Sequence, residues 1–383
     1  LYDFSTDPWE HENLVSDLGQ GARLESMRRH LPDTITSNLP EGIHPSLDSS
    51  NSRWDDGAGS LTITQDVVFN PASAENLDDV LEHFYWNIPP AVKKVIIAEN
   101  TRVTGHFRLS AADQMIIGED RATSVIFGTD TKAWARGPNR VEDEGTRCAR
   151  DGLPANLAGD DRVHDCEKWF YGAISPTDGA PSGIVFHVRN LTIENARTYA
   201  ITAHRQAWNI DGVNIINTRP APDWHSNSDG IGGGPGTVIR NTHIDTWDDS
   251  IKLYKDGFLV EDVTIVHNRN GSPFQLGWGD KPATRHTLKN VKVRQAQGTE
   301  GQAFNLAMFA NSRGQVDATV VLDGVKAHYG ENTLLNKCED GQPLPLVYLA
   351  GEESRLTLIS KEKGDFSYST PVLECGPGKL QLK

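Results

Sequence analysis

The pattern of apolar residues repeats along most of the chain. From about Lys94 onward, short β-rich pieces are separated by Asn, Asp and Gly, and a turn residue followed by alternating apolar positions recurs after 22, 29, 21, 28 and 34 residues. The six copies begin at Asn190, Gly212, Asn241, Asp262, Asn290 and Gly324. An equivalent strand that returns at this spacing predicts stacked coils. We therefore expect an all-β fold, a right-handed parallel β-helix.

A β-sandwich is the competing architecture, because it also contains many short strands with turn signals. Sandwich strands recur as hairpins after about 8 to 12 residues. Here the equivalent strand returns only after 21 residues or more, and tight Asn-Gly hairpins are scarce. This spacing favours the solenoid.

Three segments depart from the repeat. Residues 1–60 are polar, rich in proline and without sustained periodicity, so we expect an N-terminal arm ahead of a β-helix domain at 61–383. Within 75–87 the apolar residues follow a helical stripe, which predicts a helix capping the open end of the sheets. Residues 129–182, rich in Gly, Asp and Pro, are expected to form a large loop. The stripe consists of Leu77, Val80, Leu81, Phe84 and Tyr85.

The composition limits the classes of partner. With 37 % hydrophobic and 23 % charged residues, the chain has the content of a soluble globular protein. A net charge of −15 argues against nucleic acid as a partner, since a binder of that polyanion needs a basic surface. No run approaches the roughly 18 apolar residues that a membrane span requires. We expect neither nucleic acid nor membrane as a partner, and the sequence leaves the oligomeric state open.

The four cysteines fall into two pairs that are close in sequence, Cys148 with Cys166 and Cys338 with Cys375. This is not the tight spacing of a zinc site, and we expect no metal and no cofactor. The pairs favour two local disulfides in a secreted, extracellular or periplasmic protein, although four free thiols in a cytosolic protein would fit the same spacing. The chain begins at Leu1 without a hydrophobic leader, so either a signal peptide was removed or the chain was trimmed.

A group of carboxylates carries the candidate chemistry. Asp248 and Asp249 are adjacent, and Asp229 precedes them by about one coil. Strand alternation places Lys252 outward and Asp249 inward, where an unpaired carboxylate would cost several kcal/mol. We therefore expect the backbone to bend near Asp249, so that both acids of the pair reach the surface. Carboxylates this close cannot all ionise easily, so the pKa of one should rise.

Residues one coil apart become neighbours about 4.8 Å apart in a β-helix. Gln275 follows Lys252 by 23 residues, so successive coils should gather the acids, Lys252 and Gln275 on one outward face. Trp278, flanked by glycines, is well placed to stack on a sugar ring. The candidate substrate-binding set also includes His225 and Asn227, which precede Asp229 in the sequence.

Each feature has an ordinary structural explanation when taken alone. An Asp-Asp pair in a turn is usually solvated. Residues 227–236 could form a coil corner that needs positive φ, Lys252 could be a surface residue pairing with acids, and Trp278 could belong to the core. Their combination at one-coil spacing is what points to proton chemistry on a sugar, with one carboxyl protonating the leaving oxygen and another activating water.

At these residues the chain resembles glycoside hydrolase family 49, the dextranases and isopullulanases, which are related in fold and site layout to the family 28 polygalacturonases. The resemblance rests on residues 248–254 and 273–278 with Asn227-Ser-Asp229 upstream, and it extends over about 185–310. It implies an inverting mechanism with Asp248 as the general acid, while Asp229 and Asp249 hold and deprotonate the water.

The chain also departs from those patterns. Family 49 normally has a β-sandwich ahead of the β-helix, where this chain has about 60 irregular residues. The Gly-His-Gly and the uronate-binding Arg-Ile-Lys of polygalacturonases are absent. We therefore expect a secreted glycoside hydrolase acting on a neutral α-glucan polysaccharide, dextran-like or pullulan-like. The alternatives are a polysaccharide lyase with a calcium-binding acid cluster, a polygalacturonase-like enzyme on a uronate polymer, and a non-catalytic glycan-binding solenoid.

Overall fold

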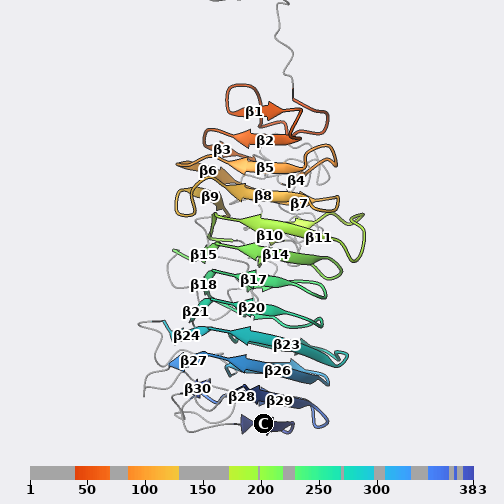
Figure 1. Ribbon diagram of the computed structural model, residues 1–383, viewed down its shortest axis with the longest axis vertical. Helices are drawn as coiled ribbons and strands as arrows, with labels where there is room; N and C mark the ends of the chain where they lie inside the picture. The colour runs from red at the N-terminus through yellow and green to blue at the C-terminus, as the bar shows by residue number, and fades with distance from the viewer. Residues whose placement is uncertain are drawn as a thin grey trace, which may run out of the picture. The chain divides into compact units, whose positions relative to one another are not determined.

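The computed structural model is all-β in the part of the chain that it describes (Figure 1). Its strands form three sheets, which we call A, B and C, and every recorded strand pair is parallel except β1 with β2. The described residues are 39–69, 85–128, 172–196, 199–218, 229–268, 271–296, 307–328, 344–361, 366–368 and 374–383. The predicted parallel β-helix is therefore confirmed.

Within each sheet, strands from successive coils lie side by side in chain order. Sheet A contains β1 (Ser52–Asp55), β2 (Ser60–Ile63), β5 (Lys94–Ile97), β8 (Met115–Gly118), β11 (Val185–Arg189), β14 (Ala207–Asp211), β17 (Val238–Arg240), β20 (Leu259–Glu261), β23 (Thr284–Lys289), β26 (Asp317–Asp323), β29 (Arg355–Ser360) and β32 (Lys379–Leu382). Sheet B contains β3 (Val67–Val68), β6 (Thr101–Thr104), β9 (Ser124–Phe127), β12 (Thr192–Glu194), β15 (Asn214–Ile216), β18 (His243–Thr246), β21 (Thr264–His267), β24 (Lys292–Gln295), β27 (Val325–His328) and β30 (Phe366–Tyr368). Sheet C contains β4 (Tyr85–Asn87), β7 (His106–Leu109), β10 (Gly172–Pro176), β13 (Tyr199–Ile201), β16 (Asp229–Gly232), β19 (Ile251–Lys252), β22 (Phe274–Trp278), β25 (Phe309–Arg313), β28 (Val347–Leu349) and β31 (Glu374–Cys375).

A tight turn between sheets A and B explains the repeat in the sequence. The chain passes from a strand of A through a short turn into B, then into C and back to A. All six residues that begin the repeated motif have positive φ, from 48° at Asn241 to 71° at Gly324. Glycine, and after it Asn and Asp, adopts this left-handed conformation most easily. The turn therefore selects the residue types that mark each coil.

Apolar side chains stack inside the coils in ladders that run from one coil to the next. In sheet B, Ile193 pairs with Ile215, Ile215 with Ile244, and Ile244 with Ile265. These four side chains are almost fully buried. In sheet C the rings of Phe274 and Phe309 stack with their centroids 5.0 Å apart. This core fixes the register of sheet C, and with it the site described below.

The first described coils differ from the sequence expectations. Strand β1 lies inside the segment expected to be irregular and pairs antiparallel with β2. The helix predicted over 75–87 is wrong at its end, because Tyr85–Asn87 form β4, which pairs in parallel with β7. Trp86 points into the core there, with its ring centroid 5.9 Å from that of Phe107. Residues 70–84, which hold the rest of that prediction, lie outside the described residues.

The expected large loop is shorter at its C-terminal side, since β10 begins at Gly172 and belongs to sheet C. Residues 129–171, which include Cys148 and Cys166, lie outside the described residues, as does Cys338. Cys375 is not a free thiol. The two cysteine pairs stay predictions. Within the described ranges no helix is long and apolar enough to span a membrane.

Candidate active site

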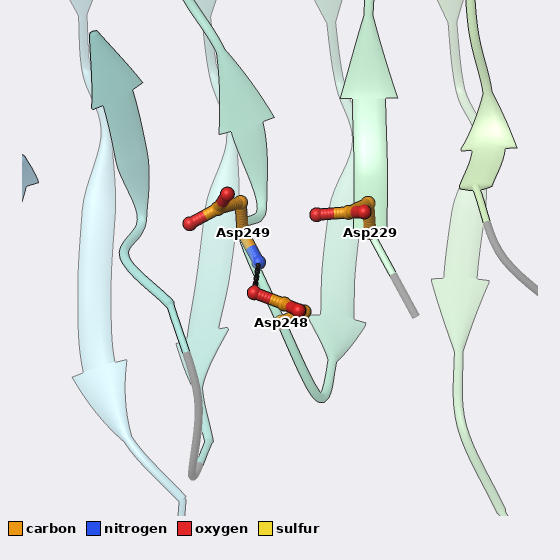
Figure 2. A group of neighbouring side chains, drawn as sticks. All are labelled: Asp229, Asp248 and Asp249. Atoms are coloured by element: carbon orange, nitrogen blue, oxygen red, sulfur yellow. Dashed lines mark hydrogen bonds between the residues drawn. The ribbon is translucent and has the colours of Figure 1, made fainter. Parts of the chain in front are cut away.

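Two neighbouring coils bring the three acids together. Asp229 is the first residue of β16, and Asp248 and Asp249 lie in the link that leads into β19. Because Ile231 of β16 pairs with Ile251 of β19, Asp229 and Asp249 occupy equivalent positions one coil apart. Figure 2 shows their carboxylates side by side with Asp248 next to them. One oxygen from each acid lies within 4.8 Å of the other two.

The backbone bends ahead of β19, as the alternation predicted. The chain bends at Trp247, Asp248 and Ser250. The expectation that both acids of the pair reach the surface is wrong for Asp249, which is buried. Burial is tolerated there because the Lys252 ammonium pairs with the Asp249 carboxylate. Gly271, in the next coil, approaches this bend closely. A Cβ atom added to Gly271 would lie 2.5 Å from an oxygen of Asp248 and 2.5 Å from one of Asp249. The bend and this glycine together shape the acid cluster.

Lys252 is buried and bridges two of the acids. Its Nζ lies 2.9 Å from Oδ1 of Asp229 and 2.6 Å from Oδ2 of Asp249. Burial alone would lower the pKa of Lys252, but the charges of Asp229 and Asp249 outweigh it and raise that pKa well above its usual range. Lys252 therefore stays charged and neutralises part of the cluster. It is not the ordinary surface lysine that the sequence also allowed.

Gln275 supports Asp249 from the following coil. It lies opposite Lys252 in the register of β19 and β22, and its side chain is fully buried. The Gln275 amide donates to both carboxylate oxygens of Asp249, at 3.3 and 3.4 Å, and to the hydroxyl of Ser312 at 3.0 Å. The backbone N–H of Ser272 also donates to Asp249, at 3.0 Å. Gln275 thus orients a carboxylate within the protein rather than facing open solvent.

Asp248 differs from the other two acids. It keeps partial exposure, whereas Asp229 and Asp249 are buried. One Asp248 oxygen accepts the backbone N–H of Asp249 at 2.8 Å. Burial raises the pKa of Asp248 well above its usual range, and the negative charges of Asp229 and Asp249 raise it further. The cluster therefore combines a carboxyl group that keeps its proton to a higher pH than an ordinary aspartate with two carboxyl groups that share a lysine.

Aromatic residues line the cluster. The Lys252 ammonium lies 5.3 Å from the ring centroid of Tyr199 and 5.6 Å from that of Tyr254. Burial raises the pKa of both phenols, so they remain neutral hydrogen-bonding groups. Trp278 is 43 % exposed, one of three large apolar side chains that stand out among the described residues. An exposed indole ring of this kind suits stacking on a sugar.

The structure brings together five of the eight residues chosen from the sequence, Asp229, Asp248, Asp249, Lys252 and Gln275. Trp278 lies three residues after Gln275 at the end of β22, with its side chain exposed. The other two, His225 and Asn227, lie outside the described residues and stay predictions. Sequence reasoning missed Tyr199, Ser272 and Ser312. Tyr199 could have been found, because Tyr199 stands opposite Asp229 once the coil register is known. Nothing in the sequence around Ser272 or Ser312 marks either residue as part of a site.

The acid cluster also has the form of a cation site. Three carboxylates with mutual oxygen distances within 4.8 Å are a donor set that calcium and magnesium prefer. The Lys252 ammonium already pairs with two of these carboxylates. A divalent ion bound by all three acids would have to compete with that ammonium.

Comparisons with known proteins give a local likeness. Dextranases from Arthrobacter sp. (strain CB-8) and Arthrobacter globiformis are 30 % and 28 % identical to this chain over 81 residues. In both cases these residues are 21 % of this chain and 12 % of the relative. The match therefore spans a small part of the dextranases.

No family model matches the chain. Among solved structures, the Agl-KA catalytic domain aligns with 78 % of this chain and 60 % of its own, at 10 % identity and a TM-score of 0.35. The sequence likeness is to glycoside hydrolases, and it does not single out glycoside hydrolase family 49.

Proposed function

We propose that this chain is a glycoside hydrolase that cleaves α-glucosidic bonds of a dextran-like or pullulan-like α-glucan. The observation that carries the proposal is the difference between Asp248 and the other two acids in exposure and in proton affinity. Asp248 is partly exposed and its pKa is raised, so that it keeps its proton to a higher pH than an ordinary aspartate, while Asp229 and Asp249 are buried against a charged lysine. Glycoside hydrolysis needs one carboxyl group in each of these states. The local likeness to two dextranases supports a glycan substrate.

Each group has a defined task in the proposed reaction. Asp248 donates its proton to the glycosidic oxygen, and the bond from that oxygen to the anomeric carbon breaks. Asp229 and Asp249 hold the water, its oxygen bonds to the anomeric carbon, and one of the two carboxylates takes the proton that the water loses, with Lys252 keeping both carboxylates in place. Trp278 stacks on a sugar ring beside them. A positioned proton donor or acceptor accelerates such a reaction by about 10²- to 10⁴-fold.

The stereochemical outcome depends on how the attacking water is held. Inverting enzymes usually hold their carboxyl groups about 6.5 to 9.5 Å apart to leave room for water. Here the nearest oxygens lie within 4.8 Å of one another. That short separation does not by itself favour inversion. We propose inversion because the resemblance to family 49 implies it, with the water held jointly by Asp229 and Asp249. Proton NMR of the first product formed tests this, since inversion requires the β-anomer from an α-glucan and retention would give the α-anomer.

A reducing-sugar screen tests the proposed activity. The protein would be incubated with dextran, pullulan, starch, other glucans and polygalacturonate. Release from dextran or pullulan by the wild type, lost in Asp248→Asn, is the expected result. Lys326→Asn, which changes an exposed residue of β27 in sheet B, serves as the matched control and should keep full activity. Release that is equal in the wild type and Asp248→Asn would remove Asp248 from the mechanism.

A polysaccharide lyase is the second candidate, because the three acids could hold a cation and cationic side chains lie near them. A lyase would act on a uronate polymer, and its unsaturated products would absorb in the ultraviolet. Chelator would abolish that absorbance gain, whereas the hydrolase would release reducing sugar without it. A non-catalytic glycan-binding solenoid would bind glycan and release no reducing sugar even after long incubation.

A further inference from the structure

Three cationic side chains lie at the ends of successive strands of sheet C, next to the acid cluster. Lys255 follows β19, Lys281 follows β22, and Arg313 ends β25. We call these three residues the cationic cluster. None of them forms an ion pair with another described residue. In a protein with 52 acidic and 37 basic residues, three neighbouring cations that form no ion pair with a described residue call for an explanation.

Two members of the cationic cluster, Lys281 and Arg313, contact the exposed Trp278. The Arg313 guanidinium lies 5.4 Å from the Trp278 ring centroid, and the Lys281 ammonium donates a hydrogen bond of 3.3 Å to the Trp278 carbonyl. The register of the two strands explains the first contact, because Trp278 of β22 pairs with Arg313 of β25. A sugar unit bound at Trp278 would therefore lie near both cations.

Tyr254 connects the cationic cluster to the acids. The Lys281 ammonium lies 4.9 Å from the Tyr254 ring centroid, and the Lys252 ammonium lies 5.6 Å from that same centroid. Because both distances are measured to the same centroid, the Lys281 and Lys252 ammonium groups are no farther apart than the sum of the two distances. One glycan chain could contact both groups of residues, so the cationic cluster belongs to the same binding surface.

The cations repel one another in the unliganded protein. Burial lowers the pKa of Lys281, and Lys255 and Arg313 lower it further, while Asp280 acts in the opposite direction. One oxygen of Asp280 also accepts the backbone N–H of Gln315 at 2.7 Å. An anion placed between Lys281 and Arg313 would relieve the repulsion. A planar guanidinium binds carboxylate and sulfate oxygens in pairs, which a sugar hydroxyl cannot match.

We propose that the cationic cluster is a subsite for an acidic substituent, a carboxylate or a sulfate ester, on the sugar unit that stacks on Trp278. The substrate would then be a glucan that carries occasional acidic groups, rather than a wholly neutral one. This inference rests on the proposed function only in taking Trp278 to face a glycan. The missing Arg-Ile-Lys motif does not argue against it, because the cations come from three separate coils.

Binding measurements separate this inference from the question of catalysis. Isothermal titration calorimetry of the Asp248→Asn protein would compare size-matched fragments of dextran, carboxymethyl-dextran and dextran sulfate at low salt. A charge-assisted hydrogen bond contributes enough for about a tenfold change in affinity or more. We expect carboxymethyl-dextran or dextran sulfate to bind about tenfold more tightly than dextran. The comparison of these two fragments identifies whether the subsite prefers a carboxylate or a sulfate ester.

Variants of the cationic cluster complete the test. Lys281→Gln and Arg313→Gln should each lower the ratio of acidic-glycan affinity to dextran affinity about tenfold. Lys326→Gln removes the same charge from sheet B and should change neither affinity. Equal affinities of the parent protein for acidic and neutral fragments, or an equal loss in Lys326→Gln, would overturn the inference.

The two proposals fail in different ways. Cleavage of dextran with no preference for acidic fragments would overturn the proposed subsite and still support the proposed hydrolase. Preferential binding of an acidic fragment with no cleavage by the wild type would overturn the proposed hydrolase and still support the proposed subsite.

Discussion

Replacing Lys252 by Met tests how the acid cluster is held together. Methionine has a similar length, so the change removes the charge with little change in packed volume. The Lys252 ammonium contacts Asp229 at 2.9 Å and Asp249 at 2.6 Å, and all three side chains are buried. Breaking a buried ion pair by removing one partner costs about 3 to 5 kcal/mol, because the other charge is left uncompensated. We expect Lys252→Met to lose free energy of unfolding in this range.

The loss should depend on pH with a definite sign. Without the ammonium, the folded protein must either bind protons at the cluster or carry unpaired buried charge, whereas the unfolded chain ionises freely. The folded state then holds more protons than the unfolded state, so stability falls as pH rises. Urea unfolding at pH 5 and pH 8, followed by circular dichroism, should show the larger loss at pH 8.

An exposed lysine provides the control for this variant. Lys289 pairs with Glu261, but half of its side chain is exposed, and pairs of this kind contribute little. Lys289→Met should leave the urea midpoint nearly unchanged at both pH values. A Lys252→Met midpoint equal to that of Lys289→Met, or a loss independent of pH between 5 and 8, would refute the assignment of Lys252 as the counter-ion of the cluster.

Single sites elsewhere in the cluster and the core give three more expected outcomes. Gly271→Ala should lower the melting temperature and the turnover together, because the new Cβ meets both Asp248 and Asp249 at positive φ, while Gly236→Ala, with φ of 79° but no atom within 4 Å, should reduce only the melting temperature. His286 is buried, and burial lowers its pKa to about 4. As pH falls below about 6.5, the unfolded chain binds a proton at this residue before the folded protein does, so the free energy of unfolding should drop by about 3 kcal/mol by pH 4. His286→Leu should abolish that part of the pH dependence of the urea midpoint, and an unchanged pH dependence in the variant would contradict this explanation. The raised pKa of Asp248 predicts that kcat/KM is retained below that pKa and falls above it, and a rate that instead rises through neutral pH would argue against Asp248 as the acid.

The coil architecture was predictable because one turn constrains the sequence strongly. The residues that begin each copy, such as Asn190 and Asn241, must adopt positive φ, and few residue types do so without strain. The bend near Asp249 was predictable for a different reason. Burial of an unpaired carboxylate is costly, so strict strand alternation could not continue through Asp249.

Other features depended on information that the sequence does not carry locally. Tyr85 continues an apolar pattern that fits a helix, but pairing with β7 made it part of a strand. The three residues of the cationic cluster share no motif. Lys281 is close to Trp278 in the sequence, but Arg313 reaches Trp278 only through the pairing of β22 with β25. Gln275 was expected to face a sugar, yet its amide is held by Asp249 and Ser312, which no strand count reveals.

Turnover of two substrates by Asp248→Asn tests the central claim most directly. The natural leaving group is a sugar alkoxide that needs a proton, whereas a 2,4-dinitrophenyl α-glycoside of the same glucan unit leaves without one. We predict that Asp248→Asn loses about 10²- to 10⁴-fold in kcat on the glucan. On the dinitrophenyl glycoside the variant should stay within about tenfold of the wild type, since no proton transfer to the leaving group is lost. An equal loss on both substrates, or no loss on the glucan, would contradict Asp248 as the general acid.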